Sequence, residues 1–95
     1  MRIDHEALTD LCSRHGITRL RVFGSFVRGD AGDGSDVDLL VEFEDRKSLL
    51  DLVRIEREFS EHFGREVDLL RPSSLSPYLR DRILAEAQVV YERAA

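Results

Sequence analysis

The chain has 95 residues, of which 42% are hydrophobic and 35% charged, and it carries a formal net charge of -5. This balance is typical of one globular domain, so we expect residues 1–95 to form a single domain with one core. The acidic balance argues against direct nucleic-acid binding, and no apolar run is long enough to cross a bilayer. One cysteine cannot form an intramolecular disulfide, so a cytoplasmic protein is expected.

The N-terminal segment predicts a helix followed by a strand. Asp4 is a suitable N-cap, apolar residues recur at helical spacing as far as Cys12, and Gly16 is expected to end the helix. Cys12 lies on the apolar stripe, so we interpret it as a core residue. Residues 17–23, with the sequence ITRLRVF, have the composition of the first strand of a sheet.

A candidate phosphate site follows that strand. Gly24 allows the backbone to approach a bulky anion, and Ser25 offers both an N–H and a hydroxyl group. Residues 26–31 suit a short helix whose N-terminus faces the phosphates. Arg28 lies about one turn along this helix, where it would contact a phosphate or an acidic group of the site. The alternative for Arg28 is an ion pair that tethers the loop.

A candidate metal site lies at the start of the second predicted strand. Asp36 and Asp38 are two residues apart in a run that continues with apolar residues, so in extended backbone both carboxylates leave on the same face. Burying a carboxylate in such a strand without a partner is costly, which favours a bound cation. The alternative is an Asp-rich turn in which Ser35 is the hydrogen-bonding partner, but that interpretation leaves Gly24 and Ser25 unexplained.

A long helix and a third strand are predicted in the second half of the chain. Ser48 begins a capping box, and Gly64 is expected to end the helix. Residues 66–70, EVDLL, alternate as a short strand that places Asp68 among hydrophobic residues. Asp68 is either part of the site or a surface residue on an edge strand. The helix is expected to present a broad apolar face formed by Leu49, Leu52, Val53, Ile55, Phe59 and Phe63.

A final helix is predicted to start at Ser76, because Pro77 then occupies its first position. Its core-facing stripe is expected to consist of Leu79, Ile83, Ala87 and Val90.

The joint pattern Gly24-Ser25-x-x-Arg28-Gly29 and Ser35-Asp36-x-Asp38 resembles the signature of the polymerase-β-like nucleotidyltransferase superfamily. Within it, the short chain resembles the minimal nucleotidyltransferase (MNT) antitoxins, which are paired with HEPN-domain toxins. The resemblance implies an α+β (α/β-like) nucleotidyltransferase fold, with a small mixed sheet of about three to four strands packed by about four helices. It also implies that the third strand pairs beside the second, so that Asp68 joins Asp36 and Asp38.

The resemblance further implies an Mg²⁺-dependent enzyme that transfers AMP from ATP to a tyrosine hydroxyl of a cognate HEPN-type ribonuclease toxin. Asp36, Asp38 and Asp68 would bind two Mg²⁺ ions and act in catalysis, with Asp68 helping to deprotonate the acceptor. The nucleotide would be bound by Gly24, Ser25, Arg28 and Ser35.

Two alternatives remain. One is a non-catalytic antitoxin that neutralises its partner by occlusion. The other is a nucleotidyltransferase acting on a small molecule, although those enzymes resemble longer chains with an additional helical domain.

Overall fold

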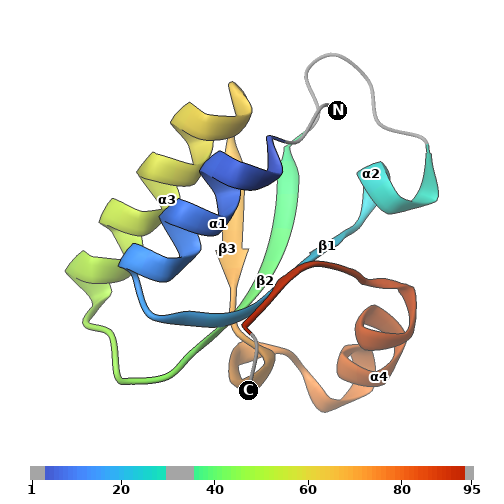
Figure 1. Cartoon of the computed structure of the whole chain (residues 1–95). Coiled ribbons are helices and arrows are strands. Elements are labelled where there is room, and N and C mark those ends of the chain that lie inside the picture. Colours follow the sequence, from blue (N-terminus) through green and yellow to red (C-terminus); the bar gives the residue numbers. More distant parts are fainter. Residues whose placement is uncertain (1–3, 30–35, 94–95) are drawn as a thin grey trace.

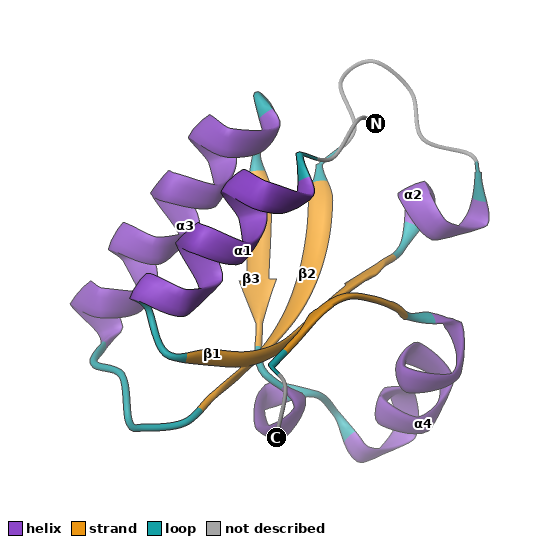
Figure 2. Ribbon diagram, in the orientation of Figure 1, coloured by secondary structure: helices purple, strands orange, loops and turns teal. Residues whose placement is uncertain are grey.

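The computed structural model of the protein describes residues 4–29 and 36–93. Figure 1 and Figure 2 show its helices and strands in chain order. The elements are α1 (His5–Arg14), β1 (Ile17–Phe23), α2 (Ser25–Arg28), β2 (Val37–Phe43), α3 (Leu49–Phe63), β3 (Val67–Leu70), the short 3-10 helix η1 (Pro72–Ser74), α4 (Pro77–Glu86) and β4 (Gln88–Glu92). None of the helices within these described ranges is both long enough and apolar enough to span a membrane.

The four strands form one mixed sheet in the order β3-β2-β1-β4. β1 pairs antiparallel with both β2 and β4, whereas β3 pairs parallel with β2. A parallel pair needs a crossover connection, and α3 provides it between β2 and β3 (Figure 2). The expected α+β fold, with a small mixed sheet and four helices, is therefore confirmed.

The hydrophobic core lies between one face of the sheet and the helices α1 and α3, which run side by side in Figure 1. Cys12 is fully buried there, as predicted, and burial raises the pKa of its thiol to about 12. Such a thiol stays protonated and packs as a small apolar group. The other core residues are Leu8, Leu11, Ile17, Leu20, Val22, Val37, Leu39, Val41, Ile55, Phe59 and Val67.

The predicted ends of α3 are confirmed, but its predicted apolar face is too broad. Ser48 forms a capping box with Asp51, and Gly64 ends the helix with φ of 68°. However, Leu49 is 78% exposed and Val53 is 53% exposed. The buried residues of α3 begin only at Ile55, because its first turn contributes nothing to the core beneath the helix.

The last helix was predicted to continue through Val90, and this is wrong. α4 ends at Glu86, and residues 88–92 form β4 instead. Two valines and a tyrosine favour extended backbone there, and pairing with β1 satisfies the backbone groups at an edge that would otherwise be open. Val90 does pack against the core, but as part of a strand. Leu79 and Ile83 are not core residues, since no residue of α4 is buried.

Candidate active site

Two carboxyl groups lie beside each other where β2 and β3 begin. The parallel pairing places Asp38 directly opposite Asp68, which confirms that the third strand lies next to the second. Burial raises the pKa of Asp38, and the negative charges of Asp68 and Asp36 raise it further. A hydrogen bond between the carboxyl groups of Asp38 and Asp68 acts in the same direction. Asp38 therefore holds a proton more readily than an isolated aspartate, and a nearby cation would relieve the same repulsion.

Asp36 lies just before β2 and is exposed. It is two residues from Asp38, and its charge acts on that side chain, so three carboxyl groups gather at this end of the sheet. Within residues 4–29 and 36–93, no three His, Cys, Asp or Glu side chains are arranged closely enough to form a ready-made metal site. The donor chemistry nevertheless fits Mg²⁺, which prefers carboxylate oxygens, so Asp36, Asp38 and Asp68 are the residues that would hold it.

Gly24 directly follows β1, and its Cα faces the Asp38 carboxylate at close range. It has φ of 80° and ψ of -148°, and it precedes the first residue of α2, Ser25. A Cβ atom at this position would lie 2.3 Å from Asp38 Oδ2, which is far inside van der Waals contact. Only glycine therefore allows the turn after β1 to approach the carboxylate, and this turn positions the phosphate-binding motif predicted from the sequence.

The rest of that motif is partly described. The helix predicted over residues 26–31 is shorter than expected, because α2 covers Ser25–Arg28 and Gly29 ends it with φ of 81°. Residues 30–31 lie outside the described residues. Ser35, predicted to contact the nucleotide, lies outside them as well.

Arg28 joins the motif to α4. Its Nη1 donates a hydrogen bond of 3.0 Å to Glu86 Oε1, and its side chain is 53% exposed. Its positive charge also lowers the pKa of Asp38, although the effects that raise that pKa are larger. The ion pair with Glu86 agrees with the tethering role considered from the sequence. A contact between Arg28 and a phosphate or an acidic group of the site stays a prediction.

A cleft of about 400 Å³ separates the motif from α4. Gly24, Arg28 and Asp38 line one side, and Leu79, Arg82 and Ile83 line the other. This volume lies within the usual range of small-molecule sites. Sequence reasoning missed the role of α4, because apolar residues at positions i and i+4 look the same in a helix that lines a cleft as in one that packs on a core. The signal that could have revealed it is the pair of charged residues, Arg82 and Glu86, on the same helical face.

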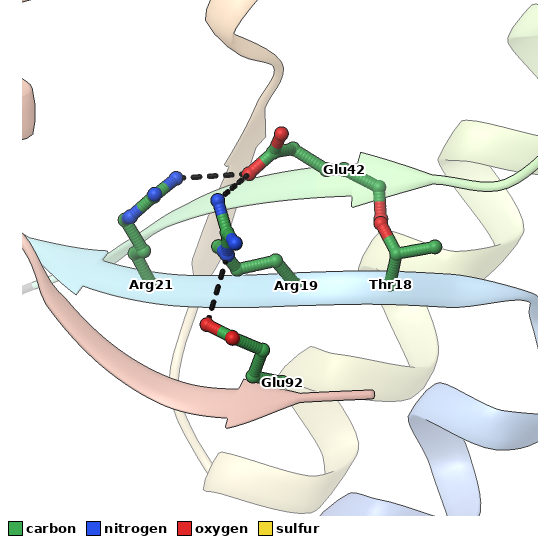
Figure 3. A network of polar contacts seen from close by, with 5 residues as sticks. All are labelled: Thr18, Arg19, Arg21, Glu42 and Glu92. Atoms are coloured by element: carbon green, nitrogen blue, oxygen red, sulfur yellow. Dashed lines mark hydrogen bonds and ion pairs between the residues drawn. The ribbon is translucent and has the colours of Figure 1, made fainter. Parts of the chain in front are cut away.

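The charged residues farther along this face of the sheet pair with one another (Figure 3). Arg21 Nη1 donates a hydrogen bond of 2.9 Å to Glu42 Oε2, and Arg19 Nη1 lies 3.6 Å from the same oxygen. Arg19 Nε also donates to Glu92 Oε2 of β4 at 3.0 Å. Because Asp38 and Glu42 are four residues apart in one strand, they share a face, and the Glu42 end forms direct ion pairs with two arginines.

Comparison with known proteins agrees with this geometry. Residues 5–90 match the family model described as "Nucleotidyltransferase domain". A Methanocaldococcus jannaschii protein with the provisional name protein adenylyltransferase is 51% identical over 74 residues, which are 78% of this chain and 80% of that protein. The protein adenylyltransferase MntA of Thermococcus cleftensis is 43% identical over 82 residues, which are 86% of this chain and 81% of that protein.

Two solved structures have the same fold. One, provisionally described as a minimal nucleotidyltransferase, has a TM-score of 0.76 and 45% sequence identity, with 88% of this chain and 86% of that chain covered. The other contains a tri-AMPylated HEPN toxin of Shewanella oneidensis in complex with an MNT antitoxin. It has a TM-score of 0.69 and 15% identity, and covers 94% of this chain and 70% of that chain. At that level of identity, the second comparison shows the fold alone.

Proposed function

The chain belongs to the nucleotidyltransferase domain family, and on this premise we propose that it is an antitoxin that transfers AMP from ATP to a tyrosine hydroxyl of a HEPN-type ribonuclease toxin. The observation that carries the proposal is the pairing of Asp38 with Asp68, with Gly24 close against the Asp38 carboxylate. The name of the Thermococcus relative, protein adenylyltransferase, supports a protein as the acceptor. The AMPylated HEPN toxin in the structure with an MNT antitoxin supports the class of that protein.

In this proposal Asp36, Asp38 and Asp68 bind two Mg²⁺ ions, which supply positive charge to the attacking and leaving oxygens of an in-line displacement. Asp68 is exposed on the edge strand, so it can accept the proton of an incoming hydroxyl group. The acceptor oxygen bonds to the α-phosphorus of ATP, the bond from that phosphorus to the bridging oxygen breaks, and pyrophosphate leaves.

The nucleotide-binding role falls to the motif that follows β1. Gly24 gives the phosphates access beside Asp38, and Ser25 provides its N–H and hydroxyl groups. Arg28 contributes positive charge while Glu86 orients its guanidinium group. Ser35 completes the set in the proposal, although it lies outside the described residues.

The acceptor is proposed to be a tyrosine brought by a partner protein. In the described part of the chain, α1 and α3 pack on one face of the sheet and α4 lines the cleft, so these helices are already engaged. A phenol, with a pKa of about 10, loses its proton more easily than the hydroxyl of serine or threonine. The reaction is placed in the cytoplasm, which supplies ATP and Mg²⁺ and suits the single, unpaired Cys12.

Mass spectrometry tests the proposal directly. The purified chain is incubated with Mg²⁺, ATP and the protein encoded by the neighbouring gene, and the products are digested and weighed. We expect additions of whole AMP units on a tyrosine of the partner, absent when ATP or Mg²⁺ is omitted and absent with Asp38→Asn. If the partner is bound and silenced while its mass stays unchanged, the enzymatic proposal fails and inhibition by occlusion replaces it.

A further inference from the structure

One face of α4 contains both apolar and charged residues, whereas a helix face that only packs against a core is apolar. Leu79, Arg82, Ile83 and Glu86 are at positions i, i+3, i+4 and i+7, so they lie on one side of the helix. All four line the cleft that also contains Asp38. Leu79 is 49% exposed, so the cleft has an accessible apolar wall beside its charged groups.

The charges that line the cleft do not all compensate one another. Arg28 and Glu86 form an ion pair at 3.0 Å, which leaves Arg82 and Asp38 as the remaining cation and anion of the lining. Among residues 4–29 and 36–93, nothing forms a hydrogen bond or an ion pair with the side chain of Arg82. Asp38 lies next to the like charges of Asp68 and Asp36. The cleft therefore offers a cation-binding group at Asp38 and an anion-binding group at Arg82.

A nucleoside triphosphate with a bound divalent cation carries both complementary charges in one ligand. Its cation suits the carboxyl groups at Asp38, and its phosphate oxygens suit a guanidinium group, which donates in a fixed fork geometry. Its base and ribose offer a largely apolar surface to a wall such as that of Leu79 and Ile83. We propose that α4 forms half of the nucleotide site, in which Arg82 binds a phosphate group and Leu79 and Ile83 contact the nucleoside.

This inference rests on the proposed function, because it takes a nucleotide to be the ligand of the cleft. It adds to that function a binding element outside the Gly24–Asp38 motif, about 45 residues farther along the chain. It also assigns the two walls of the cleft different tasks: the motif positions the reacting phosphorus, and α4 provides affinity for the rest of the nucleotide.

Calorimetric titration of a non-hydrolysable ATP analogue with Mg²⁺ tests the role of Arg82. Because a charge-assisted hydrogen bond to phosphate is lost, we expect Arg82→Ala to weaken binding on the order of tenfold or more, and Arg82→Lys to retain part of the affinity. Arg57→Ala removes an exposed arginine from α3 and is the matched control, with wild-type affinity expected. Arg82 is exposed, so its replacement should leave thermal unfolding unchanged.

Two simpler probes separate the phosphate contact from the nucleoside contact. Inorganic tripolyphosphate with Mg²⁺ should lose affinity in Arg82→Ala but not in Leu79→Ser, whereas the ATP analogue should lose affinity in both. Unchanged affinity of Arg82→Ala for the ATP analogue would overturn the inference, and so would an equal loss in Arg57→Ala. A wild-type protein that binds no ATP analogue would overturn it together with the proposed function.

Steady-state kinetics with the partner protein distinguishes the two proposals. If Arg82-dependent nucleotide binding occurs but the partner never gains AMP, the nucleotide site stands and the protein adenylyltransferase proposal fails. If AMP is transferred and Arg82→Ala leaves the KM for ATP unchanged while raising the KM for the partner, the cleft holds the acceptor. That outcome would contradict the assignment of α4 to the nucleotide site and would leave the proposed function intact.

Discussion

Two acidic residues of β2, Asp38 and Glu42, occupy the same face of the same strand but have opposite surroundings. Glu42 faces Arg21 at 2.9 Å and Arg19 at 3.6 Å, so its charge is neutralised within the sheet (Figure 3). Asp38 faces Asp68 across the parallel pair and has Asp36 two residues away. At the Glu42 end of the strand the negative charge is paired with arginines, whereas at the Asp38 end several negative charges lie near one another.

The difference shows where stability and function separate in this small fold. A half-exposed ion-pair network such as that of Glu42 contributes modestly to stability and needs no bound ion or ligand. Like charges that act on Asp38 from Asp68 and Asp36 cost stability in the free protein, and a bound cation would offset that cost. The same strand thus carries a structural network and a proposed binding site within five residues, 38 to 42.

The largest effect is expected from removing the negative charges at the Asp38 end of β2. In the double variant Asp36→Asn plus Asp38→Asn, we expect loss of Mg²⁺-dependent ATP binding and of AMP transfer. The variant should be at least as resistant to denaturant as the wild type, because like-charge repulsion is relieved. Calorimetry with Mg²⁺ and ATP, together with urea unfolding, measures both. Wild-type nucleotide affinity in this variant would contradict the metal assignment.

The variant Asp68→Asn should distinguish the role of Asp68 from that of Asp38. If Asp68 accepts the proton of the acceptor, its replacement should lower the rate of AMP transfer by about 10²–10⁴-fold, the usual contribution of a general base, with a smaller loss of nucleotide affinity. Single-turnover transfer to the partner protein and a parallel ATP titration give the two quantities. Normal transfer by the variant would make Asp68 an ordinary residue of an edge strand.

Gly24→Ala tests the close approach of the turn to Asp38. The new Cβ would meet Asp38 Oδ2 at 2.3 Å, in a backbone with φ of 80°, so both steric overlap and strain are expected. Gly64→Ala is the matched control, since Gly64 has φ of 68° and nothing within 4 Å of a new Cβ. We expect a cost of about 1–2 kcal/mol for the strain alone in Gly64→Ala, and a larger cost in Gly24→Ala.

Only Gly24→Ala should also weaken binding of Mg²⁺ and ATP, because only that residue lies against the candidate site. Urea unfolding of the two variants, with calorimetry alongside, measures the difference. Equal stability losses and unchanged binding in both variants would show that the approach of Gly24 to Asp38 is incidental.

The smallest effect is expected at the compensated end of β2. Glu42→Gln should reduce the free energy of unfolding by about 1 kcal/mol or less, because a part-exposed ion pair contributes little. It should leave AMP transfer unchanged. A double-mutant cycle with Arg21→Met isolates the pairwise energy, and a large loss of transfer in Glu42→Gln would remove the contrast between the two ends of the strand.

The sequence predicted the parts of the molecule that depend on local rules. The capping box at Ser48, the ends of α1 and the strand that contains Asp38 follow from spacing and side-chain chemistry over a few residues. The Gly24-Ser25 motif was recognised for the same reason. The proximity of Asp68 followed only from the resemblance, because strand pairing is a long-range property that no local pattern encodes.

The parts that escaped prediction depend on what lies opposite a residue. Val90 fits a helical stripe, yet it belongs to a strand because β1 offers it an edge. Leu49 looks apolar enough for the core, but the sheet contributes no buried contact to that turn of α3. Leu79 and Ile83 have helical spacing, and only the fold shows that they border a cleft.

The strand β4 has a mechanical consequence for that cleft. β1 leads directly into Gly24 on one wall, α4 of the other wall leads directly into β4, and the two strands pair with Val22 opposite Gln88. Each wall of the cleft is therefore attached to one of two paired strands, β1 or β4. The register of this pairing determines how the two walls are placed relative to each other. Because a strand advances about 3.3 Å per residue, a slip of one residue in this pairing would slide α4 past Gly24 by that amount. The position of α4 relative to Gly24 is thus held by hydrogen bonds between β1 and β4, outside the cleft itself.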